Sequence, residues 1–173
     1  MTFHHIWFDP GLTTGWAYFE DDRPTRMGEL IYPSELFQFL SSKYFPWSNS
    51  NLDLVGYENY RIRPEGHERG WTPKWDEVIP IRVIGAIEMA VWNYNSNLEM
   101  RTQEPDVKHA GYGYANLGKY DPNKPGMHMQ DAIAHGSFYY MENYLAVRKS
   151  PNSKKGRIPS YSPTRGIRPR RRT

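Results

Sequence analysis

The alternation of apolar and polar residues predicts a protein that begins with three strands. Runs of β-branched and aromatic residues mark these strands at positions 4–9, 16–20 and 27–32. Residues 21–24 have the composition of a turn, and short connections join antiparallel neighbours, so the three segments should form a meander. Gly11 and Gly15 are expected to supply the left-handed backbone conformations of the first turn.

A helix is predicted next, with Ser34 as its N-cap. Its apolar residues recur at helical spacing and are Leu36, Phe37, Leu40 and Tyr44. Residues 46–51 should form a loop, and residues 52–58 form another strand. A strand reached through a helical crossover runs parallel to the strand it joins. Glu58, at the end of residues 52–58, is therefore expected beside Asp9, which ends the first strand.

The remaining pattern predicts two longer helices around one more strand. Apolar residues cover a wide face of residues 76–92, a strand follows at 98–103, and the last helix spans 129–147. The apolar face of residues 76–92 either packs on the sheet or meets a partner subunit. Residues 111–126 are rich in glycine, tyrosine and asparagine and should form a loop. The order of elements favours an α/β fold with a mixed five-stranded sheet flanked by helices.

Charge is unevenly distributed along the chain. No Asp or Glu occurs from residue 143 to the end, whereas that segment holds ten of the 22 Lys and Arg residues. Residues 1–147 contain the other 12 Lys and Arg residues and all 19 acidic residues, and so carry a net charge of −7. We expect one domain over 1–147 and a basic tail over 148–173 that has no fixed structure alone. Such a tail serves as an electrostatic arm for phosphate backbones or as a solubilising terminus.

The composition also limits the chemistry. Cysteine is absent, so any metal ion must be held by carboxylate, imidazole or carbonyl groups. No apolar run approaches the roughly 20 residues that a membrane-spanning helix needs, so no membrane partner is expected. A cytoplasmic location is compatible with both observations.

Four polar residues occur where the predicted elements would bring them together. Asp9 and Glu58 end strands, and His128 and Asp131 lie three residues apart at the start of the last helix. Taken singly, Asp9 is explained by an Asp-Pro-Gly turn, and the helical pair by capping and the helix dipole. Taken together, oxygen and imidazole ligands without thiol indicate Mg²⁺ or Mn²⁺. Two such ions catalyse phosphodiester cleavage in many nucleases.

Basic and aromatic residues alternate without helical or strand period over residues 59–74. The segment is interpreted as a loop at the carboxyl end of a strand, which either binds nucleic acid or is simply solvated. The residues predicted to bind DNA are Tyr60, Arg61, Arg63, Arg69, Trp71, Lys74, Lys119 and Lys124.

Three motifs in this order resemble the RuvC-like Holliday junction resolvases of the ribonuclease H-like superfamily, particularly the smaller versions encoded by phages. They are Phe8-Asp9-Pro10-Gly11-Leu12-Thr13-Thr14-Gly15-Trp16-Ala17, Tyr57-Glu58, and His128-Met129-Gln130-Asp131-Ala132-Ile133-Ala134-His135. The resemblance covers about residues 3–147. It implies a ribonuclease H-like fold and hydrolysis of four-way DNA junctions with two Mg²⁺ ions per site, for which Mn²⁺ can substitute.

The resemblance also implies roles for individual residues. Asp9, Glu58 and Asp131 would be catalytic metal ligands, and His128 stands where some members have Asp, as a ligand or a proton shuttle. Lys108 matches the family's lysine near the scissile phosphate, with Lys119 as the second candidate. Tyr60 or Trp71 would stack on an unpaired base at the junction centre. Further implications are a homodimer formed through residues 76–92 and, for a phage protein, a location in the host cytoplasm.

Three other functions share some of these features. A broader branched-DNA, flap or RNA–DNA hybrid endonuclease would use the same fold and site. The actin-like and sugar-kinase ATPases also have an Asp-x-Gly hairpin, but they duplicate the fold, and 173 residues hold one copy. A non-catalytic protein that binds DNA through its basic tail would leave the three acids unexplained.

Overall fold

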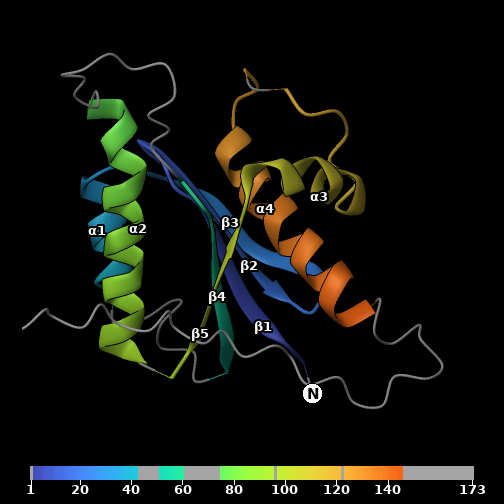
Figure 1. The fold of residues 1–173 in the computed structure, drawn as a ribbon, viewed down its shortest axis with the longest axis horizontal. Coiled ribbons are helices and arrows are strands. Elements are labelled where there is room, and N and C mark those ends of the chain that lie inside the picture. The colour runs from blue at the N-terminus through green and yellow to red at the C-terminus, as the bar shows by residue number, and fades with distance from the viewer. Residues whose placement is uncertain (1, 43–50, 61–74, 96, 122, 146–173) are drawn as a thin grey trace, which may run out of the picture.

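The computed structural model describes residues 2–42, 51–60, 75–95, 97–121 and 123–145. Five strands form one sheet, with helices α1 and α2 on one face and α3 and α4 on the other (Figure 1). The predicted α/β architecture with a mixed five-stranded sheet is thus confirmed. The predicted loop at 46–51 lies almost wholly outside the described residues, as do most of the loop at 59–74 and the whole basic tail.

The strand order places the first strand in the centre of the sheet. The strands are β1 (His4–Asp9), β2 (Thr13–Glu20), β3 (Arg23–Ile31), β4 (Leu52–Glu58) and β5 (Glu99–Gln103). Their order is β3-β2-β1-β4-β5. The pairs β1–β2 and β2–β3 are antiparallel, as the meander requires. The pairs β1–β4 and β4–β5 are parallel, so the predicted crossover geometry is confirmed.

The helices connect and cover these strands. They are α1 (Ser34–Leu40), α2 (Trp75–Tyr94), α3 (Lys108–Tyr114) and α4 (Met127–Tyr140). A 3₁₀ turn (Pro105–Val107) precedes α3, and a π-helical turn (Met141–Leu145) follows α4. The predicted helix at 129–147 therefore starts two residues earlier, and its regular α-helical part ends at Tyr140.

Alternation along β1 divides the core into two parts. Ile6 and Phe8 pack with residues of α1 and α2, whereas Trp7 packs with residues of α4. Because successive side chains of a strand point to opposite faces, Asp9 shares the α4 face with Trp7. Both faces of β1 are covered, which explains why its sequence is an almost continuous apolar run.

The loop predicted at 111–126 is partly wrong, because Gly111–Tyr114 belong to α3. A Cβ on Gly111 would lie 2.0 Å from the carbonyl oxygen of Ala134 in α4. The absence of a side chain therefore allows the two helices to touch, and this contact outweighs the low helix propensity of glycine.

The first turn also differs from its prediction. In the part of the chain that the structure describes, the left-handed glycines are Gly118 and Gly126, not Gly11 or Gly15. A Cβ on Gly15 would instead lie 1.9 Å from the carbonyl oxygen of His128. Gly15 is thus needed for the close approach of α4 to β2, not for its backbone angles.

Several element boundaries also differ from the prediction. Strand β2 begins at Thr13, three residues before the predicted start at residue 16. Strand β3 begins at Arg23 and includes Pro24, although residues 21–24 were predicted as a turn. A proline, which has no backbone N–H, is tolerated there because β3 is an edge strand. On its outer side no neighbouring strand among those described requires a backbone hydrogen bond. At α1 the N-cap position is Pro33, and Ser34 is the first helical residue.

His5 should make the stability of this fold sensitive to acid. Burial lowers the pKa of His5 from 6.5 to about 4, although a hydrogen bond to the carbonyl of Asp21 opposes the shift. Above the unfolded pKa of 6.5 the ring is neutral in both states, and the folded protein has its full free energy of unfolding. Between pH 6.5 and pH 4 the ring takes up a proton only in the unfolded chain, so the free energy of unfolding falls. The complete loss is about 3 kcal/mol. We expect His5→Gln to flatten this part of the pH dependence, measured by urea unfolding between pH 7 and pH 4. Equal slopes for both proteins would contradict this assignment.

Candidate active site

The carboxyl ends of three neighbouring strands carry polar side chains in one row. Phe8 of β1 pairs with Tyr57 of β4, and the next residues are Asp9 and Glu58. Glu58 in turn pairs with Gln103 of β5. Asp9 and Glu58 therefore lie side by side, as their positions at the ends of parallel strands predicted.

Helix α4 brings three more polar residues over this row. His128, Asp131 and His135 are spaced by three and four residues, so they form one stripe along the helix. The Nδ1 atom of His128 lies 2.6 Å from Oδ2 of Asp9. Asp131 is buried, at 1% exposure, and so is Asp9, at 6%.

Helix α3 contributes Lys108 and Tyr112, one turn apart. The ammonium group of Lys108 donates to Oδ2 of Asp131 at 3.0 Å and lies 3.4 Å from Oε2 of Glu58. The hydroxyl of Tyr112 donates to Oδ1 of Asp131 at 2.8 Å. Both oxygens of Asp131 therefore accept a hydrogen bond from α3, and Lys108 bridges two of the three acids.

Asp9 is the acid whose charge is least compensated. Burial raises its pKa, the charges of Glu58 and Asp131 raise it further, and the hydrogen bond with His128 opposes them. The same hydrogen bond raises the pKa of His128. Three carboxylates in one buried region repel each other, so an additional cation there would be stabilising.

Glu58 and Lys108 stabilise each other as ions. Burial alone would raise the pKa of Glu58, but a hydrogen bond from His135 and the charge of Lys108 bring it below its ordinary value. Burial opposes the charge of Lys108, yet the charge of Glu58 and the hydrogen bond to Asp131 raise its pKa. Lys108 thus remains an ammonium ion at neutral pH.

The donor set fits a hard divalent cation in its chemistry. Asp9, Glu58 and Asp131 supply carboxylate oxygens and His128 an imidazole nitrogen, a combination that suits Mg²⁺ or Mn²⁺. Among the described residues, no group of three or more His, Asp or Glu side chains is arranged as a metal site. Instead, Lys108 forms ion pairs with Glu58 and Asp131, and the imidazole of His128 is hydrogen-bonded to Asp9.

The structure thus brings together Asp9, Glu58, His128, Asp131 and Lys108. Tyr60 follows Glu58 by two residues and is half-buried, whereas Lys119 and Lys124 are exposed between α3 and α4. The remaining residues predicted to bind DNA lie outside the described part of the chain, namely Arg61, Arg63, Arg69, Trp71 and Lys74.

Sequence reasoning missed three residues of the site: Gln103, Tyr112 and His135. Gln103 ends a strand as Asp9 and Glu58 do, so the same argument would have selected it. His135 lies one turn after Asp131 on the predicted helix. Tyr112 lies one turn after Lys108, but this relation was hidden because residues 111–126 were predicted as a loop.

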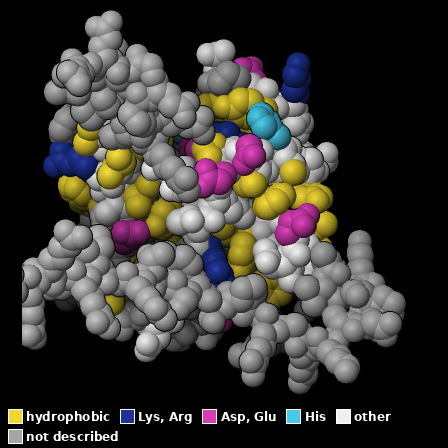
Figure 2. All heavy atoms as spheres, viewed as in Figure 1, with side chains coloured by type: hydrophobic (Ala, Val, Ile, Leu, Met, Phe, Trp, Pro, Cys, Tyr) yellow, Lys and Arg dark blue, Asp and Glu magenta, His cyan; other side chains and the backbone are white. Residues whose placement is uncertain are grey.

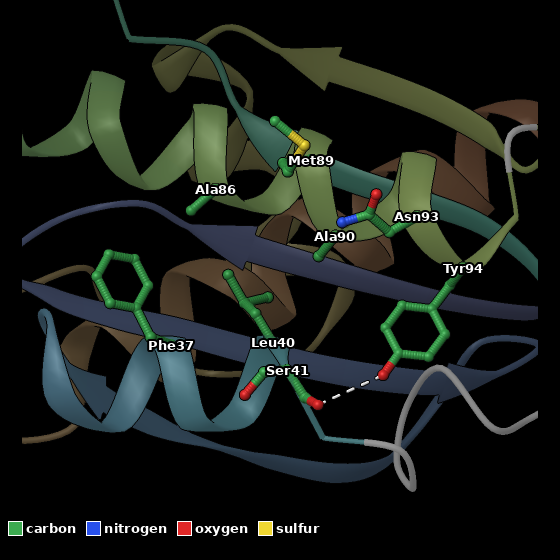
Figure 3. A pocket seen from close by; sticks show the side chains of 8 residues that line it. All are labelled: Phe37, Leu40, Ser41, Ala86, Met89, Ala90, Asn93 and Tyr94. Carbon is green, nitrogen blue, oxygen red and sulfur yellow. Dashed lines mark hydrogen bonds between the residues drawn. The ribbon is translucent and has the colours of Figure 1, made fainter.

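The molecular surface adds two observations. Figure 2 shows acidic side chains over the region of α3 and α4, whereas basic side chains are scattered over the same view. An open groove of about 530 Å³ lies between α1 and α2, on the face of the sheet opposite to the one that Asp9 shares with α4 (Figure 3). The groove is therefore separate from the cluster of acids.

A mixed five-stranded sheet of this order, covered by helices on both faces, is a ribonuclease H-like fold. In the described segments, no helix has the length and apolar composition needed to cross a membrane.

Among solved structures, the chain is similar to RuvC of Thermus thermophilus. For T. thermophilus RuvC in complex with Holliday junction substrate, the TM-score is 0.55 at 12% identity, covering 81% of this chain and 94% of that chain. For a second T. thermophilus RuvC structure, the TM-score is 0.51 at 15% identity, covering 80% and 95%. No family model and no curated protein sequence matches the chain. The resemblance to RuvC is thus confirmed at the level of the fold.

Proposed function

We propose that this protein is a metal-dependent endonuclease that cleaves four-way DNA junctions. The observation that carries the proposal is the convergence of Asp9, Glu58 and Asp131, from three separate elements, on one edge of a RuvC-like sheet. The similar RuvC structure is a complex with Holliday junction substrate, which supports branched DNA as the substrate class.

Asp9, Glu58 and Asp131 would hold the divalent ions, with His128 as a further ligand or a proton shuttle. When bound, such ions activate a water molecule and stabilise the leaving 3′ oxygen of a phosphodiester. Tyr112 and Lys108 orient Asp131 through hydrogen bonds to its two oxygens. Lys108 also brings a permanent positive charge, which would attract a phosphate to the acidic cluster.

Basic and aromatic residues outside the acidic cluster would supply the contacts with DNA. Tyr60 and the basic residues of 61–74 follow Glu58 directly, and Lys119 and Lys124 lie between α3 and α4. Because residues 1–147 carry a net charge of −7, we infer that the basic tail of residues 148–173 supplies much of the attraction to DNA.

The test is cleavage of a labelled four-way junction, a flap, a linear duplex and an RNA–DNA hybrid, with Mg²⁺, Mn²⁺ or EDTA. We expect paired symmetric nicks in the junction, which disappear with EDTA. A preference for the flap or the hybrid would contradict the four-way junction as the substrate but would leave metal-dependent phosphodiester hydrolysis as the reaction. Cleavage that persists in EDTA would contradict the metal-dependent mechanism.

A homodimer formed through α2 would suit a substrate with two-fold pseudo-symmetry. The inner face of α2 packs on the sheet through Val83, Ile87 and Val91, so the interpretation as core is confirmed for that face. The outer face nevertheless exposes Ile81, Met89 and Trp92, with Trp92 69% exposed. Their spacing places these three residues on one stripe of the helix. Of the three, Met89 also lines the groove between α1 and α2 (Figure 3).

We therefore expect Trp92→Lys to convert a dimer into monomers, because a charge would replace the most exposed aromatic side chain of the stripe. Sedimentation equilibrium measures the mass directly. Tyr114→Lys, at another exposed aromatic residue, is the matched control and should leave the mass unchanged. A wild-type protein that is monomeric at micromolar concentration would contradict the proposed dimer.

A further inference from the structure

His135 is a fully buried polar side chain that the proposed chemistry leaves without a role. It is 0% exposed and lies on the α4 stripe one turn after Asp131. Its Nε2 atom lies 2.8 Å from Oε2 of Glu58, and its Nδ1 atom lies 2.8 Å from Oε1 of Gln103. The imidazole therefore connects the ends of two neighbouring strands.

The direction of the hydrogen bond to Glu58 follows from chemistry. A carboxylate oxygen accepts, so the Nε2 atom must carry a proton and donate it. At the other nitrogen, either the ring donates to the oxygen of Gln103, or the amide is turned and its NH₂ group donates to the ring. In both arrangements Gln103 holds the ring so that Nε2–H points at Glu58.

The ring itself has little freedom to turn. It stacks on Trp7, with centroids 6.2 Å apart and planes inclined by 12°. Trp7 is also 0% exposed, and its indole N–H donates to Nδ1 of His5 at 3.0 Å. The donor to Glu58 is thus held by packing on one side and by a hydrogen bond on the other.

We propose that His135, oriented by Gln103, is a positioning residue that fixes the carboxylate of Glu58. The hydrogen bonds from His135 and Lys108 both use Oε2 of Glu58, and within the described segments no hydrogen bond or ion pair uses Oε1. Oε1 is therefore the oxygen left for a cation. This inference rests on the proposed function, in which Glu58 is a metal ligand; partners of this kind typically change metal affinity by about 10–100-fold.

The variants distinguish the loss of the hydrogen bond to Glu58 from the loss of packing around a buried side chain. His135→Gln places an amide NH₂ near the position of Nε2 and keeps a donor to Glu58, whereas His135→Leu removes it. His5 offers a matched control, since it is equally buried, accepts a hydrogen bond from the same tryptophan and uses both ring nitrogens. His5→Leu should cost stability as His135→Leu does, without touching Glu58.

The first measurement is Mn²⁺ binding to the full chain by calorimetry, at a temperature where each variant is folded. We expect His135→Leu to weaken binding by about 10–100-fold, and His135→Gln and His5→Leu to remain near wild type. Wild-type affinity for His135→Leu, or equal losses for Leu and Gln, would overturn the proposal. If His135→Leu does not fold, Gln103→Leu replaces it with a loss in the same direction.

A second measurement requires no metal and separates this inference from the proposed function. Nitrogen-15 spectra of the metal-free protein should show a proton on Nε2 of His135 that exchanges slowly with water and shifts in Glu58→Gln. A ring protonated only on Nδ1 would overturn the inference even if the enzyme cuts junctions. If wild type binds no Mn²⁺ but this proton is present, the metal-dependent function fails and the positioning of Glu58 stands.

Discussion

Replacing Asp9 by Asn should lower the rate of junction cleavage by on the order of 10³-fold, about 4 kcal/mol of transition-state stabilisation. Asn has the same shape but no charge, so it would bind a divalent cation poorly. The same substitution should leave the metal-free protein at least as stable as wild type. The reason is that burial and the charges of Glu58 and Asp131 raise the pKa of Asp9. The ionised carboxylate therefore destabilises the metal-free folded protein.

Cleavage rate and thermal unfolding together test this prediction. Mg²⁺ should raise the melting temperature of wild type by mass action and have little effect on Asp9→Asn. Asp53→Asn is the matched control, because Asp53 lies near the opposite end of β4 from Glu58 and accepts a hydrogen bond from the backbone of His4. It should cleave at the wild-type rate. Cleavage by Asp9→Asn at that rate would place the active site elsewhere.

The strands that position the acids could be predicted because their sequences are unambiguous. Strands β1 and β4 are short apolar runs that end in a carboxylate, and the crossover rule makes them parallel. Asp9 and Glu58 therefore follow from local pattern and one topological rule. The position of Asp131 followed from helical spacing and from the resemblance to RuvC.

The remaining contacts of the site depend on packing that no local pattern encodes. Helix α3 has glycines at positions 111 and 113, which are unfavourable in an isolated helix, and Gly111 is required by contact with α4. The link between His135 and Gln103 joins residues 32 positions apart and depends on how α4 packs on the sheet. Such a relation can be found only once the helix is placed on the sheet.

Gly15 is where this packing should be most sensitive to mutation. Its Cβ would lie 1.9 Å from the carbonyl oxygen and 2.0 Å from the carbonyl carbon of His128, and 2.5 Å from the backbone nitrogen of Met129. These are backbone atoms at the start of α4, so no side chain can rotate out of the way. Gly15→Ala must therefore move the helix that carries His128 and Asp131.

We expect Gly15→Ala to lower cleavage by about 10²-fold, since a shift of about 1 Å is enough to disturb a catalytic site. Overpacking of this kind costs about 1–3 kcal/mol of stability, measured by urea unfolding. Gly113→Ala is the matched control, because its Cβ would meet no atom within 4 Å. It should stabilise α3 by about 0.5–1 kcal/mol and leave cleavage unchanged. Wild-type stability and cleavage for Gly15→Ala would mean that α4 does not lie against β2 at this point, and the contact between His128 and Asp9 would then lose its structural basis.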